Sequence, residues 1–397
     1  MQGKVHMLSI SDGNSQLDDL LRTSIADFDI PNHIYQLAVA RYEDLGAWLA
    51  RYWDASPQDG IIYPQGSLRL GTVVQPVNER DDCDVDLVCL RDIDKVSTSQ
   101  SALKADSGTG ITGYVRSNPD GSPTRNEGTR CWNLDYPGEP FHMDVLPAIP
   151  NTDTGGNAIW LTDRELRQWQ SSNPLDYADW FHATMRQDFL RAQAVLAKRM
   201  DVATVPAWQV KTPLQRTVQA LKRHRDLHFA KSPKDKPASI IITTLAALAY
   251  TGGGTLYEAL ADVTAKMPCL IEVRDGVYWV PNPVQPDENF ADRWRSHHIR
   301  SRHFFDWIEK AHHDITSYGT DMGSGLDRVL EKIAASFGER SARRAGESIG
   351  TRTVQARNAG LLGMASGSGL LGAAVVRPSR PVPQHTFHGA LPERRGQ

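Results

Sequence analysis

Two aspartates separated by a single residue lie inside an apolar stretch of this sequence. Asp84 and Asp86 occur in CDVDLVCL, residues 83–90. Side chains alternate along a strand and each residue advances about 3.3 Å, so we expect the two carboxylates to share one face. Two adjacent buried carboxylates cost several kcal/mol or have raised pKa values, and bound cations remove this cost. The spacing therefore predicts a site for two divalent ions roughly 3.5–4 Å apart.

A third carboxylate, Asp144, lies in another apolar stretch, FHMDVLPAI, residues 141–149. If this stretch is a neighbouring strand, Asp144 completes a ligand set made only of oxygen, which suits Mg²⁺ or Mn²⁺. His142 could face the same site, although we expect it to pack or to form a hydrogen bond. The alternative for an isolated Asp-x-Asp pair is an exposed sheet edge that binds nothing.

A glycine and a serine, Gly66-Ser67, precede the acidic stretch in YPQGSLRLG, residues 63–71. Glycine lets the backbone approach a phosphate, and the hydroxyl and N–H groups at a helix start can hold it. A phosphate site upstream of three carboxylates is hard to explain by the alternative of an exposed edge. Asp81 and Asp82 are interpreted as solvated loop charges, and Cys83 has no metal-binding partner in the sequence.

The elements that must position these residues follow from hydrophobic periodicity. A long helix is expected from Pro31 to Trp53 and a long loop with at most one helix over 97–126, and the pattern becomes helical from Leu161. Short strands are expected in GIIYP, CDVDLVCLR, GTRCWNLDYP and PFHMDVLPAIP. The fold class is therefore α+β. We predict an α+β core lobe with N-terminal helices at 1–175, a helical lobe at 176–345 and a flexible Gly/Pro-rich tail at 346–397.

Composition excludes several classes of function. The 397 residues carry a formal net charge of −3, so no duplex-binding basic face is expected. The four cysteines are scattered without a C-x-x-C pair, which argues against structural zinc and disulfides. No apolar run approaches the roughly 20 residues that span a bilayer. We expect a cytoplasmic protein that does not enter a membrane.

These motifs together resemble a known family. YPQGSLRLGTVVQP followed by CDVDLVCL and the later Asp144 is similar to the polymerase β-like nucleotidyltransferases, and within them to bacterial CD-NTases of the cyclic GMP-AMP synthase type. The resemblance continues through residues 169–181, 221–250 and 277–294, and a short patch at 386–389. Leu175-Asp176 departs from the family pattern, far from the acidic residues. The resemblance implies a mixed-sheet lobe and a helical lobe bridged by the long N-terminal helix.

The resemblance also assigns roles to individual residues. It implies that Asp84 and Asp86 bind both metals and that Asp144 binds the catalytic one. The residues implied to contact the triphosphate are Gln65, Gly66, Ser67, Lys222 and Ser239. Two of these have structural alternatives: Lys222 as a solvated lysine beside an apolar helix stripe, and Ser239 as a helix N-cap only.

The activity implied by the resemblance is two-metal attack of a ribose hydroxyl on the α-phosphate of a nucleoside triphosphate, with release of pyrophosphate. A second round would close a cyclic di- or trinucleotide, the second messenger of CBASS anti-phage defence. Its partners would be an effector that reads the product and a conjugation enzyme or regulator at the tail, without a duplex nucleic acid activator. Two alternatives stay open: a template-free nucleotidyltransferase acting on a protein or RNA end, and a catalytically silent nucleotide sensor.

Overall fold

The computed structural model divides the chain into two compact units. One unit is Phe28–His313, and the other combines Met1–Asp27 with Asp314–Gln397. The structure describes residues 16–56, 61–78, 81–117, 123–163, 169–202, 205–322, 325–359, 362–365, 371–373 and 379–381.

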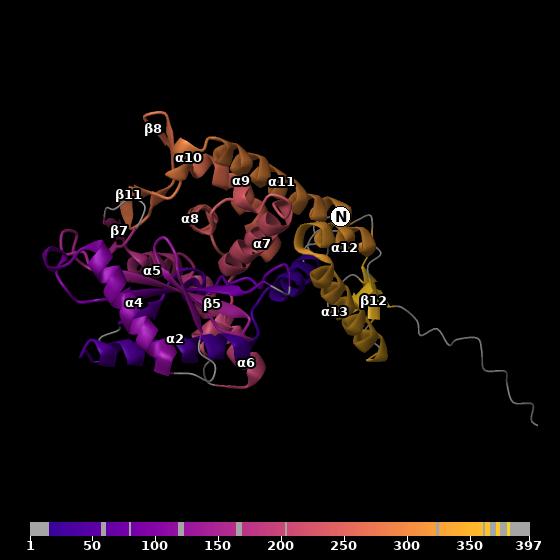
Figure 1. The fold of residues 1–397 in the computed structure, drawn as a ribbon. Helices are drawn as coiled ribbons and strands as arrows, with labels where there is room; N and C mark the ends of the chain where they lie inside the picture. Colours follow the sequence, from indigo (N-terminus) through magenta and orange to yellow (C-terminus); the bar gives the residue numbers. More distant parts are fainter. Residues whose placement is uncertain are drawn as a thin grey trace, which may run out of the picture. The chain divides into compact units, whose positions relative to one another are not determined.

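A seven-stranded mixed sheet forms the centre of the larger unit (Figure 1). Its order is β1-β2-β5-β4-β3, with β6 on β5 and β7 on β6. β2 and β5 run parallel and the other pairs are antiparallel, which confirms the mixed sheet expected from the sequence. The strands are β1 (Ile62–Pro64), β2 (Cys83–Leu90), β3 (Thr124–Glu127), β4 (Trp132–Asp135), β5 (Phe141–Pro150), β6 (Ile159–Leu161) and β7 (Gln170–Ser172).

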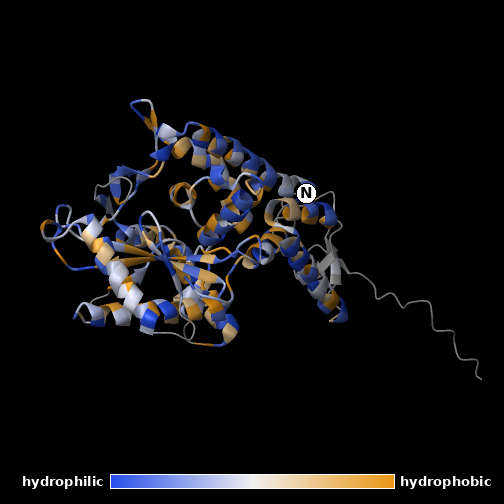
Figure 2. Cartoon of the chain, in the orientation of Figure 1, coloured by the Kyte–Doolittle hydropathy of each residue, from blue (hydrophilic) through white to orange (hydrophobic). Residues whose placement is uncertain are grey.

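Two helices cover one face of this sheet, α2 (Asn32–Tyr52) and α4 (Gln100–Ser117) (Figure 1). The strands at the centre of this sheet consist mostly of hydrophobic residues (Figure 2). Val85 and Leu87 of β2 and Met143 and Val145 of β5 belong to the core cluster that includes buried residues of both helices. Because strand side chains alternate, the aspartates between these residues point away from α2 and α4.

The sequence interpretation of residues 161–170 as helical was wrong at both ends. Leu161 ends β6 and Gln170 begins β7, and residues 164–168 lie outside the described residues. The reason is pairing: β6 adds to the edge of β5, and β7 adds to β6, which overrides a weak local helix preference. The long loop expected over 97–126 is largely absent from the described residues: α4 is the one helix that the interpretation allowed, but it fills most of the region, and β3 begins at Thr124.

Helices follow the sheet in the chain, as the periodicity predicted. They include α7, whose start is fixed by a capping box between Thr212 and Gln215. The helices of this part are α5 (Pro174–Thr184), α6 (Arg186–Met200), α7 (Pro213–His228), α8 (Ser239–Ala249), α9 (Leu256–Lys266), α10 (Arg293–Ser296) and α11 (Ile299–Asp321). Short antiparallel pairs, β8 (Glu272–Arg274) with β9 (Val277–Trp279) and β10 (Pro281–Asn282) with β11 (Gln285–Asn289), lie between α9 and α10.

Side chains on one face of α7, together with Lys211 just before it, bind the backbone of residues 70–75. We call this set of hydrogen bonds the α7 clamp. Its donors on the helix are spaced four, three and one residues apart, so they lie along one face. The bonds join Gln215 to the Leu70 carbonyl (2.9 Å), Lys211 to Gly71 (2.7 Å), Lys222 to Thr72 (3.1 Å), Gln219 to Val73 (2.7 Å) and Arg223 to Gln75 (2.8 Å).

The smaller unit is built from terminal segments of the chain. A helix at 16–26 is followed, far along the sequence, by α12 (Leu326–Phe337), α13 (Glu339–Asn358) and the three short strands β12 (Leu362–Ala365), β13 (Leu371–Ala373) and β14 (Ser379–Pro381). α13 therefore extends past residue 345, where the sequence placed the start of the tail. The boundaries at 175 and 345 stay predictions. Among the described helices, none combines the length and the apolar character needed to cross a membrane.

Asp27 connects the two ends of the chain within this smaller unit. Its buried carboxylate accepts hydrogen bonds from Arg340 Nε (3.2 Å), Arg344 Nη1 (2.6 Å) and Ser341 Oγ (3.0 Å). Charge-assisted bonds to a buried carboxylate are among the stronger polar contacts in proteins. Asp27 thus fixes α13 to the N-terminal segment.

We expect Asp27→Asn to lower the free energy of unfolding of the smaller unit by about 1–3 kcal/mol, because the buried charge-assisted bonds are lost. Urea denaturation followed by circular dichroism measures this. Asp19→Asn is the matched control: Asp19 pairs with Arg352 at 2.8 Å, but both side chains are about half exposed. It should change stability by less than about 0.5 kcal/mol. Equal effects of the two variants would contradict this role for Asp27.

Candidate active site

The three predicted carboxylates lie on two adjacent parallel strands. In the pairing of β2 with β5, Asp86 is directly opposite Asp144 and Asp84 is directly opposite His142. All four side chains are on the face of the sheet away from the α2–α4 core, since their neighbours along each strand belong to that core. The structure therefore brings Asp84, Asp86 and Asp144 together, as the strand alternation predicted.

The charges on this face are partly balanced. His142 Nε2 lies 3.0 Å from Asp84 Oδ1, and this hydrogen bond lowers the pKa of Asp84 and raises the pKa of His142 to about 9. At Asp86 the balance is reversed: burial, followed by the charges of Asp84 and Asp144, outweighs the charges of Lys222 and His142 and raises the pKa of Asp86 to about 6. Asp86 is thus the carboxylate at which additional positive charge would be most favourable.

The carboxylates fit a divalent cation by their chemistry. Oxygen donors on adjacent strands are what Mg²⁺ or Mn²⁺ takes, and a cation would offset the burial and the neighbouring negative charges that raise the pKa of Asp86. Within the described residues, however, no three His, Cys, Asp or Glu side chains form a ready ligand group. Two hydrogen bonds engage the outer carboxylates, because Asp84 pairs with His142 and Asp144 accepts a bond from the side-chain amide of Asn133 on β4.

The Gly66-Ser67 turn packs directly against Asp86. Gly66 begins the short helix α3 (Gly66–Leu70) with a φ of +54°, and the backbone N–H of Gln65 donates to the Asp86 carbonyl at 2.9 Å. A Cβ at Gly66 would lie 2.7 Å from Asp86 Oδ2. Only glycine satisfies both the left-handed φ and this close approach. The turn that begins α3 is therefore positioned by the same strand that carries the acidic pair.

Lys222 reaches this region from α7. Its ammonium donates to the carbonyl and hydroxyl oxygens of Thr72, at 3.1 and 3.2 Å. Burial lowers its pKa to about 7, and the charge of Arg225 adds to this effect while Asp86 opposes it. Lys222 is buried, so the alternative of a solvated lysine is wrong. The structure places its charge within the electrostatic field of the acidic strands.

Ser239 begins α8, but it does not cap the helix. The N-cap is Ala238, which makes no side-chain capping bond, so the interpretation of Ser239 as an N-cap only is wrong. Its hydroxyl instead accepts a hydrogen bond from Arg225 Nη1 at 2.8 Å. Arg225 also donates to the Pro237 carbonyl and pairs with Asp226. The Ser239 hydroxyl is therefore oriented by Arg225, the residue whose charge also acts on Lys222.

Comparisons with known proteins agree with this geometry. Residues 61–147, from β1 to β5, match the family described as "Cyclic GMP-AMP synthase DncV-like, nucleotidyltransferase domain". The chain is 29% identical over 393 residues to a c-di-GMP synthase of Roseivirga ehrenbergii, a match that covers 96% of this chain and 100% of that relative. The chain is a CD-NTase. It is therefore a nucleotidyltransferase, as the resemblance implied.

This CD-NTase also shares its fold with solved structures. The CD-NTase CdnG of Bradyrhizobium diazoefficiens, solved in complex with GTP, aligns with a TM-score of 0.66 at 20% identity, covering 84% of this chain and 99% of that one. The CdnC:HORMA-deltaN complex of E. coli MS115-1 aligns with a TM-score of 0.56 at 16% identity, covering 81% and 96%. These likenesses confirm the α+β, polymerase β-like nucleotidyltransferase fold.

Sequence reasoning about this CD-NTase anticipated one residue beside the carboxylates and missed two others. His142 was expected to pack or form a hydrogen bond, and it binds Asp84; its position two residues before Asp144 was the available signal. Asn133 and Thr72 were missed because their partners come from distant segments, which no local pattern reveals. Asp81 and Asp82 are exposed, in agreement with their interpretation as loop charges.

We expect Asp86→Asn to stabilise the metal-free CD-NTase. The pKa of the Asp86 carboxyl is about 6 in the folded protein, whereas an aspartate in the unfolded chain loses its proton near pH 4. Between these two pH values the folded protein binds more protons than the unfolded chain. The stability of the wild type therefore falls as pH rises from about 4 to about 6. The variant avoids that loss. Urea denaturation in EDTA should show it about 1–3 kcal/mol more stable at pH 8, with no difference below about pH 4.

Asp84→Asn is the matched control for that measurement. The pKa of Asp84 is lowered, so its ionised form is favoured in the fold and its replacement should bring no gain at pH 8. A variant at Asp86 that is less stable than wild type at pH 8 would contradict the proposed charge repulsion.

Proposed function

We propose that this CD-NTase makes a cyclic di- or trinucleotide from nucleoside triphosphates. The observation that carries the proposal is the register of β2 and β5, which sets Asp86 opposite Asp144 immediately beside the Gly66-Ser67 turn. The similarity to a c-di-GMP synthase along nearly the whole chain supports a cyclic product. Because that relative is named for a guanine product and CdnG was solved with GTP, we expect GTP among the substrates.

The substrate triphosphate would bind at the start of α3. Gly66 leaves room for a phosphate oxygen near the backbone, and the Ser67 hydroxyl and neighbouring N–H groups can donate to it. Gln65 precedes this turn and would contribute to the same contact. Lys222 and Ser239 would meet the triphosphate from α7 and α8, and Arg225 would keep the Ser239 hydroxyl in place.

The reaction is transfer of a nucleotidyl group by in-line attack. A ribose hydroxyl oxygen forms a bond to the α-phosphorus, the bond to the bridging oxygen breaks, and pyrophosphate leaves. The carboxylate of Asp144 accepts the hydroxyl proton. Two Mg²⁺ or Mn²⁺ ions held by Asp84, Asp86 and Asp144 would supply positive charge that favours the ionised hydroxyl and neutralises the phosphates. A second attack within the same site closes the ring.

The cellular role follows from the product. We propose that the cyclic nucleotide signals to an effector protein in CBASS anti-phage defence, as the family resemblance implies. One structural relative is a complex of CdnC with HORMA-deltaN, so a protein regulator is a reasonable partner here as well. Residues 346–397 would be the segment available to a conjugation enzyme or regulator. We also propose the division into lobes at 1–175 and 176–345.

Incubation with each labelled nucleoside triphosphate and Mg²⁺ or Mn²⁺, then phosphatase treatment and mass analysis, tests the activity. Wild type should give a small phosphatase-resistant nucleotide. The double variant Asp84→Asn, Asp86→Asn should lose roughly 10³-fold or more of the rate, since charge stabilisation of the transition state is lost. The matched control is Asp81→Asn, Asp82→Asn, which removes two exposed charges from the adjacent loop and should keep full activity.

Other outcomes of this experiment would replace the proposal. Label on a protein or RNA end would identify a template-free transferase that modifies macromolecules. Tight nucleotide binding without turnover would identify a silent sensor. Product formation by the Asp84/Asp86 double variant would contradict the assignment of the two carboxylates.

Lys222→Met should raise KM for the nucleoside triphosphate about tenfold, because a charge-assisted contact with phosphate is lost. It should leave the linkage in the product unchanged. The pKa of Lys222 is lowered to about 7, so wild-type affinity should fall as pH rises from 7 to about 8.5, while the variant should be flat over this range. Lys231→Met, at an exposed lysine after α7, is the control and should match wild type. An unchanged KM would remove Lys222 from the site.

A further inference from the structure

A large cavity lies within the larger unit, next to α3. It has a volume of about 1030 Å³ and is lined by the residues before and at the start of α2, by α3 and the residues after it, by α5 and α6, and by residues 207–211 with Gln215. Its lining includes none of Asp84, Asp86, Asp144, Ser67 or Lys222. Its volume is at the upper end of the range of small-molecule pockets. We call it the α3–α6 cavity.

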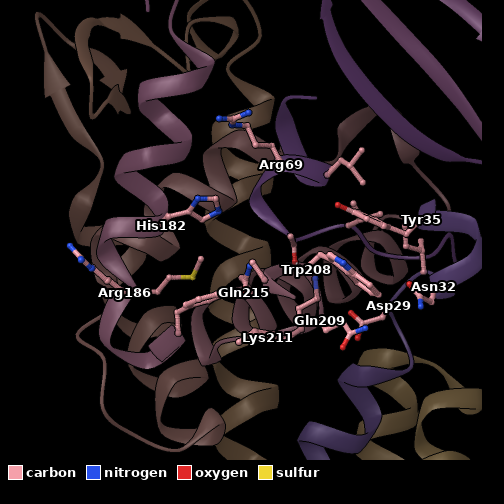
Figure 3. A pocket seen from close by; sticks show the side chains of 18 of the residues that line it. Asp29, Asn32, Tyr35, Arg69, His182, Arg186, Trp208, Gln209, Lys211 and Gln215 are labelled. Carbon is pink, nitrogen blue, oxygen red and sulfur yellow. Dashed lines mark hydrogen bonds between the residues drawn. The ribbon is translucent and has the colours of Figure 1, made fainter. Parts of the chain in front are cut away.

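One wall of the α3–α6 cavity is aromatic. The rings of Tyr35 and Trp208 stack with centroids 5.4 Å apart and an interplanar angle of 18°. Figure 3 shows this pair on one side of the cavity and His182 and Arg186 on the other. Apolar side chains such as Phe189 complete the lining. Stacked rings present a flat, apolar surface, which suits a ligand with an aromatic body.

The charged residues around the cavity are mostly cationic. Arg69, Arg186 and Lys211 line it, together with the acids Asp29 and Asp179. Asp29 is already neutralised, because Arg216 donates to its two oxygens at 2.8 Å and Gln219 adds a third bond. The buried Nε of Arg69 has no hydrogen-bond acceptor among the described residues. The balance of charge therefore favours an anion over a cation.

The cavity wall also belongs to the segment that carries the candidate phosphate turn. Gly71 and Val73 line the cavity, and the α7 clamp holds the carbonyls of both. Ser67 is connected to this segment by the bond from the Thr72 N–H to its carbonyl, at 2.9 Å. A molecule in the cavity would thus contact the segment that directly follows the helix of Gly66 and Ser67.

We propose that the α3–α6 cavity binds a small aromatic molecule that carries a negative charge, at a second ligand site separate from the acidic strands. Tyr35 and Trp208 receive its ring system, and Arg69 and Arg186 balance its charge. The site does not depend on the proposed nucleotide chemistry, so it can be tested in the absence of nucleotides.

The test uses two fluorescent probes that differ only in charge: anilinonaphthalene sulfonate, which is an aromatic anion, and neutral phenylnaphthylamine. Fluorescence titration of the full chain without nucleotide should show saturable binding of one sulfonate probe per chain. Its affinity should exceed that of the neutral probe about tenfold. In Arg69→Met with Arg186→Met this difference should disappear, while the neutral probe binds as before.

The second part of the experiment uses variants that fill the cavity. Ala183→Trp and Ala207→Trp each place a large side chain at an exposed lining position, and each should abolish binding of both probes. Ala194→Trp, at an exposed α6 position outside the lining, is the matched control and should bind both probes as wild type does. Circular dichroism verifies that each variant is folded.

Three results would overturn the proposal. The first is unchanged sulfonate binding in both folded cavity-filling variants, and the second is binding that does not saturate at one probe per chain. The third is equal affinity for the two probes in wild type, which would remove the anionic character of the site. A failure of nucleotide turnover would affect none of these measurements.

Discussion

The candidate active site depends on how α7 holds an irregular segment by its backbone. Residues 71–75 follow α3 without regular structure, so their carbonyl groups have no partners in a helix or sheet. The α7 clamp supplies these partners, with Lys211 just before the helix and Gln219, Lys222 and Arg223 on one helix face as donors. Buried backbone carbonyls need such partners, or each costs free energy. The clamp thereby fixes the segment after Ser67 relative to the helix that carries Lys222.

The clamp stabilises the fold, whereas the arrangement of carboxylates on the acidic strands lowers the stability of the metal-free fold. Asp86 remains half-buried between two other carboxylates, and its raised pKa records the free energy that this arrangement costs the metal-free fold. A hydrogen bond from His142 lowers the pKa of Asp84, whereas at Asp86 burial and the neighbouring carboxylates outweigh the charges of His142 and Lys222. A residue kept at such a cost in a packed sheet is best explained by the charge that its ligand would bring.

Most of the helices and strands that position the candidate site could be predicted from the sequence, because they depend on local periodicity. α2, β2, β5 and α8 lie where alternation or helical spacing indicated, and the shared face of Asp84 and Asp86 followed from the strand alone. Predictions failed where distant pairing decides: residues 161–170 have strand at both ends because β5 offers an edge, and Ser239 is bound by Arg225 rather than acting as a cap. The α3–α6 cavity and the α7 clamp require the tertiary arrangement of separate segments, which no single stretch encodes.

The clamp has a consequence for which substitutions the chain can accept. Its acceptors are main-chain carbonyls, which every amino acid possesses, whereas its donors are specific side chains. Side chains of residues 70–75 can therefore change without removing a carbonyl acceptor. Two positions are constrained in other ways: Thr72 also offers its hydroxyl to Lys222, and a Cβ at Gly71 would lie 2.5 Å from Gln215 Nε2. On α7 the situation is reversed, since each donor can be lost by a single substitution. Variation should thus be tolerated on one side of this contact and restricted on the other, although both sides are equally necessary to it.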